Sequence, residues 1–282
     1  DESKTGCTHI GPMTITTGAD GYWMFDDLLP GFYRVTEATV EGWYHTTPTS
    51  VGLMVCSGSY IVDIKFGNVP YTCFNGYKYE DTNGNGQLDK DELGLPGWTI
   101  VVEGVRNDGV PFYQEYTTNE NGYWETCYNI LPGEYWVSEV QQEGWIATNQ
   151  AAQYFDIPMA MENVQYHFVF LNFELGEISG YKYEDMNGNG ILDAGDLPIE
   201  GWVITLSGPV SGTTTTDASG YFEFTGLVYG VYTVTEEDRA NWVHMTQASY
   251  DVPISSGSDV CLEPFLNVEL STIWGYKFED SD

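Results

Sequence analysis

The hexapeptide Gly76-Tyr77-Lys78-Tyr79-Glu80-Asp81 decides the fold of this chain, because it returns twice along the sequence. The further copies begin at Gly180 and Gly275, and the last one carries Phe in place of the second Tyr. Copies that recur about every 100 residues predict tandem repeats of one small β domain.

The first two copies are followed by the same motifs in the same order. Asn-Gly-Asn-Gly comes first, then Gly-Trp-x-Ile, Gly-Tyr-aromatic, Tyr-x-Val-x-Glu and a strand that closes with Asn and Glu. These motifs occupy residues 83–86 and 187–190, 97–100 and 201–204, 122–124 and 220–222, 135–139 and 232–236, and 172–174 and 267–269. Apolar and polar residues alternate between turns rich in Gly, Pro and Asn, as in half-buried strands. The sequence therefore predicts an all-β chain of Ig-like sandwiches.

The N-terminal part of the chain carries only the second half of this repeat. Residues 21–23, 32–37 and 66–69 match the later motifs, but no Gly-Tyr-Lys strand precedes them. We therefore predict an incomplete sandwich module over residues 1–71 and complete modules over 72–175 and 176–270. Residues 271–282 remain as a spare strand.

The chain is strongly acidic. Nine Lys and Arg stand against 42 Asp and Glu, which gives a net charge of −33. This balance argues against nucleic acid and anionic membrane surfaces as partners, because both attract clustered cations. It fits calcium as a partner, and a solvated acidic surface is the other interpretation. The sequence has no run of about 18 apolar residues that predicts a membrane span.

Two segments match the twelve-residue calcium-loop pattern. Such a loop places oxygen ligands at alternate positions, so that six to eight of them can converge on one ion, and needs Gly at its sixth position. The predicted ligands are Asp81, Asn83, Asn85, Gln87, Asp89 and Glu92 in the first loop, and Asp185, Asn187, Asn189, Ile191, Asp193 and Asp196 in the second. The shorter carboxylate of Asp196 predicts weaker binding in the second loop. Metal-free Asn-Gly hairpin turns are the alternative.

In this combination of motifs the chain resembles the B-type repeats of Ser-Asp-repeat surface adhesins and the related collagen-adhesin B-type domains. The resemblance covers nearly the whole chain and rests on the calcium-loop, Gly-Trp-x-Ile, Pro-Gly-x-Tyr and Tyr-x-Val-x-Glu motifs. It implies prealbumin-like β-sandwiches in a protein of the cell surface, wall or an appendage. An archaeal sheath or filament is one such protein.

The resemblance also implies a self-formed amide bond in each module. Collagen-adhesin B-type domains often join a Lys of the first strand to an Asn of the last strand, with the help of a Glu. The matching residues are Lys78, Glu139 and Asn172 in the second module, and Lys182, Glu236 and Asn267 in the third. A buried Lys–Glu ion pair with a capping Asn is the alternative, because the adhesin branch of the family commonly lacks the bond.

The two ends of the chain complement each other. The first module contains Glu37 and Asn68 but no lysine strand, whereas Lys277 lies on a strand with no module after it. An apolar strand can complete an open sandwich of another copy by β-augmentation. Head-to-tail pairing of this kind predicts a homopolymer, either an open filament or a ring. The alternative is a segment cut from a longer repeat array.

Five cysteines leave several arrangements open. They form no zinc-binding pattern. Two disulfides with one spare thiol, or buried free thiols, are both compatible with the positions Cys7, Cys56, Cys73, Cys127 and Cys261.

These features point to a structural role. The sequence has no nucleophile elbow, P-loop, zinc-protease or dinucleotide motif, so we expect no enzymatic activity. The leading hypothesis is a secreted subunit, in its mature form, of an extracellular filament, sheath or surface layer. It would assemble with itself and involve calcium as a structural cofactor. The alternative is an adhesin stalk or ligand-binding surface module.

Overall fold

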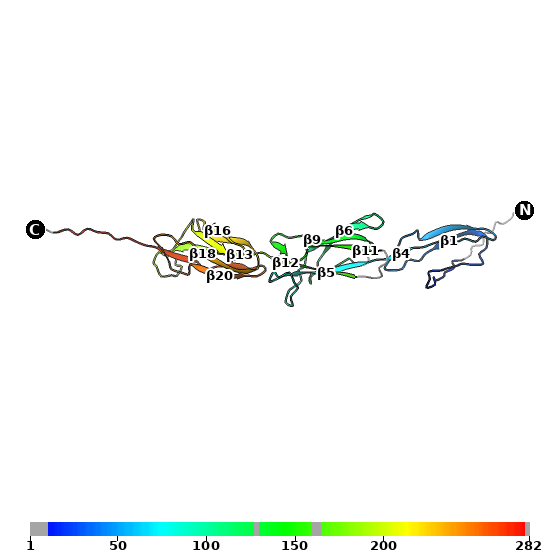
Figure 1. The fold of residues 1–282 in the computed structure, drawn as a ribbon, viewed down its shortest axis with the longest axis horizontal. Coiled ribbons are helices and arrows are strands. Elements are labelled where there is room, and N and C mark those ends of the chain that lie inside the picture. The colour runs from blue at the N-terminus through cyan, green and yellow to red at the C-terminus, as the bar shows by residue number, and fades with distance from the viewer. Residues whose placement is uncertain (1–10, 127–129, 159–164, 280–282) are drawn as a thin grey trace. The chain divides into compact units, whose positions relative to one another are not determined.

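The computed structural model describes residues 11–126, 130–158 and 165–279 (Figure 1). Every regular element in these residues is a β-strand, which confirms the predicted all-β class. The chain divides into two units, Asp1–Val69 and Pro70–Asp282. Within the described residues there is no helix with the length and apolar character of a membrane span.

The first unit contains two small two-stranded sheets and an incompletely covered core. One sheet pairs β1 (Gly31–Thr36) with β3 (Ser50–Val55), and the other pairs β2 (Trp43–His45) with β4 (Asn68–Pro70). Tyr33 and Val35 are only half-buried, although the matching Tyr135 and Val137 of the next repeat are fully buried. The inner face of β1 therefore lacks the cover that the later repeats provide.

The second unit begins with a sandwich of two four-stranded sheets. The orders are β10-β12-β5-β8 and β11-β9-β6-β7. The strands are β5 (Cys73–Glu80), β6 (Thr99–Arg106), β7 (Pro111–Thr117), β8 (Tyr123–Glu125), β9 (Gly133–Glu139), β10 (Trp145–Ala147), β11 (Ala152–Ile157) and β12 (Gln165–Glu174). Phe74, Tyr135 and Phe168 pack at its centre, with ring centroids of Phe74 and Phe168 5.4 Å apart.

The first and last strands of this sandwich are parallel neighbours. β5 and β12 pair over eight residues, from Cys73 opposite Gln165 to Glu80 opposite Asn172 (Figure 1). A Cβ atom on Gly76 would lie 2.2 Å from the carbonyl oxygen of Phe168. This close approach explains why the repeated phrase has a glycine two residues before its lysine.

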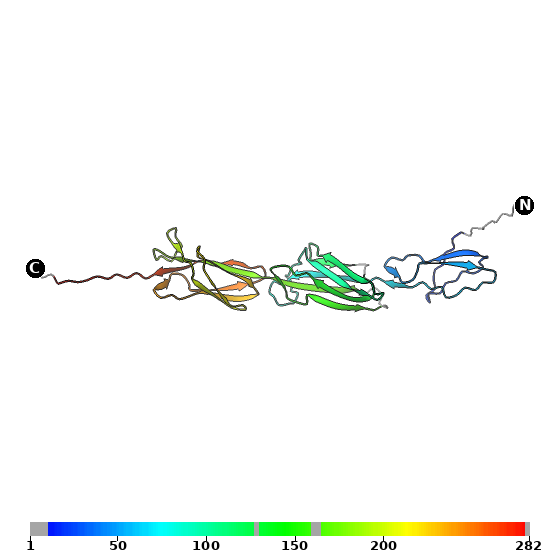
Figure 2. The ribbon, with the colours of Figure 1, turned by 90° about the horizontal axis from the view of Figure 1, so that it is seen from above.

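A second sandwich follows with the same plan (Figure 2, yellow to orange strands). Its sheets have the orders β14-β13-β22-β19, with β17 and β21 also paired to β13, and β16-β15-β18-β20. The strands are β13 (Gly176–Glu184), β14 (Leu197–Pro198), β15 (Val203–Ser207), β16 (Gly212–Thr215), β17 (Tyr221–Leu227), β18 (Gly230–Glu236), β19 (Trp242–His244), β20 (Ser249–Ile254), β21 (Asp259–Cys261) and β22 (Phe265–Glu269). Here too the first and last strands, β13 and β22, pair in parallel.

Residues 270–279 form no strand in the single chain. Ile273 is 98% exposed and Phe278 is 82% exposed. The residues at the positions of Ile273 in the two complete repeats, Phe74 and Ile178, are fully buried. The C-terminal segment therefore carries a core-type strand sequence without a core of its own.

Candidate functional site

Each complete sandwich buries a lysine against a glutamate. The Nζ atom of Lys78 lies 2.9 Å from Oε2 of Glu139, and that of Lys182 lies 3.2 Å from Oε2 of Glu236. All four side chains are completely buried. Such pairs are rare because two charges must leave water.

The sheet register places the asparagine of each set on the same face as the lysine. Lys78 pairs with Phe170, so Asn172 lies two residues further along the adjacent parallel strand. Side chains two residues apart on a strand point to the same face, and diagonal neighbours on adjacent strands lie within reach of long side chains. Lys182 pairs with Phe265, which places Asn267 in the same way. The glutamate comes from the facing sheet, where Glu139 ends β9 opposite Ile100.

A tryptophan covers each buried ammonium group. The Nζ atom of Lys78 lies 4.4 Å from the ring centroid of Trp98, and that of Lys182 lies 4.7 Å from Trp202. Both rings are almost fully buried and add a cation–π contact. The sequence prediction missed this role, although the recurrence of Gly-Trp-x-Ile at a fixed place in the repeat was a usable signal.

Burial changes the acid–base chemistry of the set. It lowers the pKa of Lys78 and that of Lys182 to about 8, against the attraction of their glutamates. Burial also raises the pKa of Glu139, in spite of Lys78 beside it. Both shifts favour the neutral forms, an amine and a carboxylic acid.

The asparagines are buried with an unsatisfied oxygen. Asn172 and Asn267 are fully buried, and among the described residues no hydrogen-bond donor reaches the Oδ1 atom of either. In the second sandwich, Nδ2 of Asn267 donates a hydrogen bond to Oε2 of Glu236 at 3.0 Å. A buried carbonyl oxygen without a donor costs about 1–3 kcal/mol, so these amides lie in a site that lacks one hydrogen donor.

Among the described residues, the first unit contains the glutamate and the asparagine of this set with no lysine paired to them. Asn68 donates through Nδ2 to Glu37, and His45 Nδ1 lies 3.1 Å from Oε2 of the same glutamate. Oδ1 of Asn68 is again buried without a described donor. Lys277, the predicted partner, is exposed in the single chain.

The backbone of the first predicted calcium loop follows the tight turn that the spacing of its ligand residues requires. Oδ1 and Oδ2 of the buried Asp81 accept hydrogen bonds from the backbone N–H groups of Asn85 and Gly86 at 3.1 and 2.7 Å. Gly86 has a φ of 73°, the left-handed conformation expected at the sixth position. Glu92 accepts from the N–H groups of Thr82 and Asp89 and so joins the two ends of the loop.

The second loop repeats this arrangement. Asp185 accepts from the N–H groups of Gly188, Asn189 and Gly190, and Asp196 takes the role of Glu92. In both loops the third and fifth residues donate side-chain hydrogen bonds to the ninth, at 2.7–2.9 Å. The structure therefore brings the predicted ligand side chains together in each loop, with Gln87 and Ile191 at the position that offers a backbone carbonyl.

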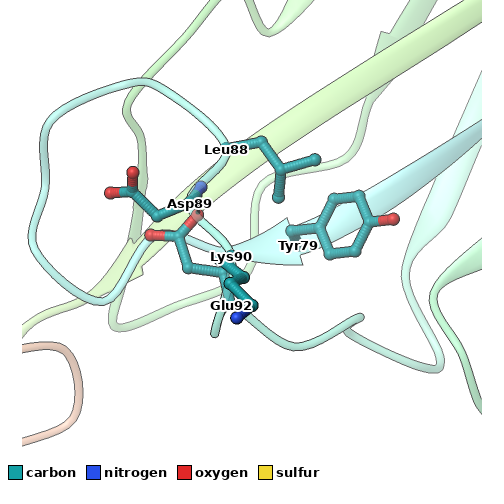
Figure 3. Close-up of a pocket in the computed structure, with 5 residues that line it drawn as sticks. All are labelled: Tyr79, Leu88, Asp89, Lys90 and Glu92. Carbon is teal, nitrogen blue, oxygen red and sulfur yellow. Dashed lines mark hydrogen bonds between the residues drawn. The ribbon is translucent and has the colours of Figure 1, made fainter.

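The first loop borders a shallow surface hollow. It is lined by Tyr79, Leu88, Asp89, Lys90 and Glu92, and Figure 3 shows the carboxylates of Asp89 and Glu92 turned toward the loop and away from Tyr79. Over the part of the chain that the structure describes, no three His, Cys, Asp or Glu side chains form a preassembled metal cage. Much of the oxygen donor set in these loops comes instead from Asn side chains.

The cysteines are only partly described. Cys73 forms a disulfide, whereas Cys56 and Cys261 are free and exposed. Cys7 and Cys127 lie outside the described residues. Both predicted arrangements are therefore wrong. Two disulfides with one spare thiol would need four bonded cysteines, and two of the five are free. Buried free thiols disagree with the disulfide of Cys73 and with the exposure of Cys56 and Cys261.

Replacing Glu139 by Gln should strongly destabilise the first sandwich, because Lys78 would lose the anion that balances its buried charge. We expect the free energy of unfolding to fall by about 3–5 kcal/mol, measured by urea titration. Glu134→Gln, an exposed change on the same strand, serves as the control and should stay within about 0.5 kcal/mol. Equal stabilities of the two variants would contradict this account of the pair.

Comparison with known proteins identifies the repeat. Residues 176–264 match the family model of the SdrD B-like domain. The serine-aspartate repeat-containing protein D of Staphylococcus aureus (strain Newman) is 28% identical over 273 residues, which cover 87% of this chain and 20% of that protein. Protein F of Staphylococcus epidermidis is 27% identical over 287 residues, or 88% of this chain and 16% of that protein. The chain thus spans about a fifth of the length of these relatives.

Solved structures give a weaker likeness. The minor pilin GBS52 of Streptococcus agalactiae is 15% identical, with a TM-score of 0.32 over 73% of this chain and 100% of that one. The Bacillus anthracis TIE protein is 19% identical, with a TM-score of 0.36 over 90% of this chain and 45% of that one. Scores this low support no conclusion about the whole chain.

The family match agrees with the extracellular, cell-surface location predicted from the sequence. It also agrees with the order of motifs around the buried lysines. Residues 176–264 therefore carry an SdrD B-like domain, and 87–88% of the chain is similar to serine-aspartate repeat-containing proteins.

Proposed function

We propose that this chain is a non-enzymatic structural segment of an extracellular protein, a stalk or filament unit that carries tension along its repeats. The observation that carries the proposal is the buried Lys–Glu–Asn set, which occurs between the first and last strands of both complete sandwiches. These are the strands through which the chain enters and leaves each sandwich.

Parallel pairing of these two strands suits a tension-bearing module. A pull on the start of β5 and on the end of β12 would slide the two strands past each other. All eight paired positions would then resist together instead of opening one by one. β13 and β22 also pair in parallel, at three positions, and would be loaded in the same direction. A covalent bond between the strands would strengthen this connection further.

The buried set has the groups that an amide bond between Lys78 and Asn172 requires. A proton passes from the Lys78 ammonium to the Glu139 carboxylate, and the free amine attacks Cγ of Asn172. The protonated Glu139 supplies the hydrogen that Oδ1 of Asn172 lacks, which stabilises the negative charge that develops there. The bond from Cγ to Nδ2 then breaks. Of the two protons that the lysine nitrogen gives up, one leaves with Nδ2 as ammonia, and the other stays on Glu139 or leaves with the ammonia as ammonium. Lys182, Glu236 and Asn267 would react in the same way.

Intact mass tests this bond directly. Each amide formed in this way releases one ammonia, so the chain should be lighter than its sequence mass by about 17 Da for each sandwich that reacts. Lys78→Arg and Lys182→Arg keep the positive charge, and each should abolish one loss. A native mass equal to the sequence mass would refute the covalent proposal and leave two buried ion pairs.

We propose in addition that both wound loops hold calcium. The fit rests on Asp81 and Asp185, which are completely buried and held by several N–H groups of their own loops. Burial raises the pKa of Glu92, and the nearby Asp81 and Asp89 raise it further. A bound cation would supply the positive charge that these crowded carboxylates lack. Asp81, Asn83, Asn85, Asp89 and Glu92 would hold it in the first loop, with Asp185, Asn187, Asn189, Asp193 and Asp196 in the second.

Removal of calcium should lower the stability of both sandwiches. At a calcium concentration about 100 times the dissociation constant, binding would contribute about 2.7 kcal/mol, so a chelator should lower the melting midpoint. Glu92→Gln should remove this response in the first sandwich and leave the second responsive. Identical melting curves with and without chelator would contradict the calcium proposal.

Head-to-tail assembly is the third part of the proposal. The first unit has a half-covered core and the pair Glu37 and Asn68, which lacks a lysine. The exposed segment 273–279 carries the missing strand sequence and Lys277. The segment of one copy would complete the first unit of the next, and Lys277 would then meet Asn68 beside Glu37.

Gly275→Ala should prevent this assembly. Gly275 occupies the motif position of Gly76, where a Cβ would lie 2.2 Å from a backbone oxygen of the neighbouring strand. We expect light scattering to show polymers for the native chain and monomers for the variant. Gly212→Ala, where nothing lies within 4 Å of the added Cβ, is the control. Lys277→Arg should still assemble, but its polymers should dissociate in detergent. Polymers of Gly275→Ala equal to those of the native chain would exclude the donated strand.

One surface feature favours a second candidate function, a ligand-binding stalk module. Trp136 and Tyr154 pair across β9 and β11 with ring centroids 5.3 Å apart, and they are 49% and 47% exposed. The second sandwich has Thr233 and Asp251 at the matching positions. Exposed paired rings offer a stacking surface, and the second sandwich has none at these matching strand positions.

A further inference from the structure

A histidine lies against the buried set of the second sandwich. Nδ1 of His244 is 2.7 Å from Oε1 of Glu236, whose other oxygen faces Lys182 and Asn267. His244 also pairs directly with Asn267 between β19 and β22. Glu236 is thus contacted by three side chains, and His244 is the one that approaches from the solvent side, with its side chain 25% exposed.

The first sandwich has no such histidine. Ala147 occupies the matching position, opposite Asn172. Oε1 of Glu139 instead accepts a hydrogen bond of 2.7 Å from Nε2 of Gln141, an amide that does not titrate. The two sandwiches therefore share the reacting groups and differ in the neighbour of the glutamate. In the first unit His45 takes the same place against Glu37.

Other charged groups reach His244 from the chain that follows β18. Nε2 of His244 lies 2.7 Å from Oδ1 of Asp238, whose side chain is 97% exposed. Arg239 binds Glu237 and lies over Trp202, with its guanidinium carbon 4.2 Å from the ring centroid. The hydrogen bond to Asp238 raises the pKa of His244, and the contact with Glu236 raises it further, although burial opposes both.

We propose that His244 is a positioning residue that makes amide formation between Lys182 and Asn267 depend on pH, whereas formation between Lys78 and Asn172 does not. This inference rests on the amide chemistry proposed above. The reaction needs Glu236 in its protonated form. A positively charged imidazole 2.7 Å away favours the carboxylate and so disfavours the reactive state. Once His244 is neutral, that opposition is removed.

The proton balance explains why the first sandwich serves as an internal control. The step that activates the lysine moves one proton from Lys to Glu within the site, so it neither takes up nor releases a proton to solvent. In the first sandwich its free energy does not change with pH while Lys78 and Glu139 share that proton. In the second sandwich the charge of His244 adds a penalty below the pKa of His244. His244 forms no bond in the reaction, but its pKa falls when Glu236 takes the proton of Lys182, because the Glu236 carboxylate helps to raise that pKa. His244 therefore releases a proton to solvent over the pH range in which the rate changes.

Protonation of His244 has opposite effects on the reaction and on stability: it disfavours amide formation but stabilises the folded second sandwich. Because the pKa of His244 is raised in the folded state, its protonation stabilises the unreacted fold fully below pH 6.5, the unperturbed value. This contribution is lost as the pH rises through the raised pKa. Acidic conditions should therefore hold the second sandwich folded and unreacted.

Refolding at a series of pH values tests the proposal. The full chain, recovered unfolded from inclusion bodies, is refolded from pH 5 to pH 8 and digested at timed intervals. Mass spectrometry of the cross-linked peptides then gives a separate rate for each sandwich. We expect the rate of Lys182–Asn267 bond formation to rise by roughly tenfold or more over this range. A change of one unit in the pKa of a reacting group corresponds to about a tenfold change in the population of its reactive form. The Lys78–Asn172 rate should remain constant.

Two reciprocal variants should exchange the pH dependence of amide formation between the two sandwiches. His244→Ala should make the second rate independent of pH, and Ala147→His should introduce a pH dependence in the first sandwich. Equal pH profiles in the two sandwiches, or an unchanged profile in His244→Ala, would overturn the role of His244 and leave the amide proposal intact. If neither sandwich loses ammonia at any pH, the amide proposal fails and this inference fails with it.

Discussion

The buried pair of lysine and glutamate is the interaction on which each complete sandwich depends. Its charges lie completely out of water, and a tryptophan, an asparagine and the ends of two parallel strands are arranged around it. A buried pair of this kind contributes little net stability compared with an apolar core of equal volume. Its presence at the same place in two repeats agrees with the proposed amide chemistry, in which the unsatisfied asparagine oxygen beside the pair would take part.

The wound loops are attached to this site through the backbone. The N–H of Asp81 donates to the carbonyl oxygen of Asn172 at 2.8 Å, and that of Asp185 donates to Asn267 at 2.8 Å. The first residue of each loop therefore holds the asparagine that would form the amide. Ordering of the loop and placement of the asparagine are coupled in the same few residues, so each feature would support the other at the point where the first and last strands end.

The three copies of the Lys–Glu–Asn set are not equivalent, because different residues surround the glutamate and the asparagine in each copy. The first unit lacks the lysine, the first sandwich has Ala147 beside its asparagine, and the second has His244. The change from Ala147 to His244 leaves the sheet register intact, because this residue lies on a three-residue strand at the edge of its sheet. A repeat of this kind can vary the chemistry of its buried site without altering its fold.

The sequence by itself determined the strand class, the wound loops and the identity of the lysine, glutamate and asparagine in each set. These features depend on neighbours in the chain: alternation decides which side chains face inward, and Gly86 allows the turn that Asp81 closes. Only the tertiary structure decided that Trp98 covers Lys78, that Gln141 or His244 completes the glutamate contacts, and that Cys73 forms a disulfide. Most of these contacts join residues that lie far apart in the chain or on facing sheets. They follow from strand pairing and sheet packing, which the local pattern of residues does not specify.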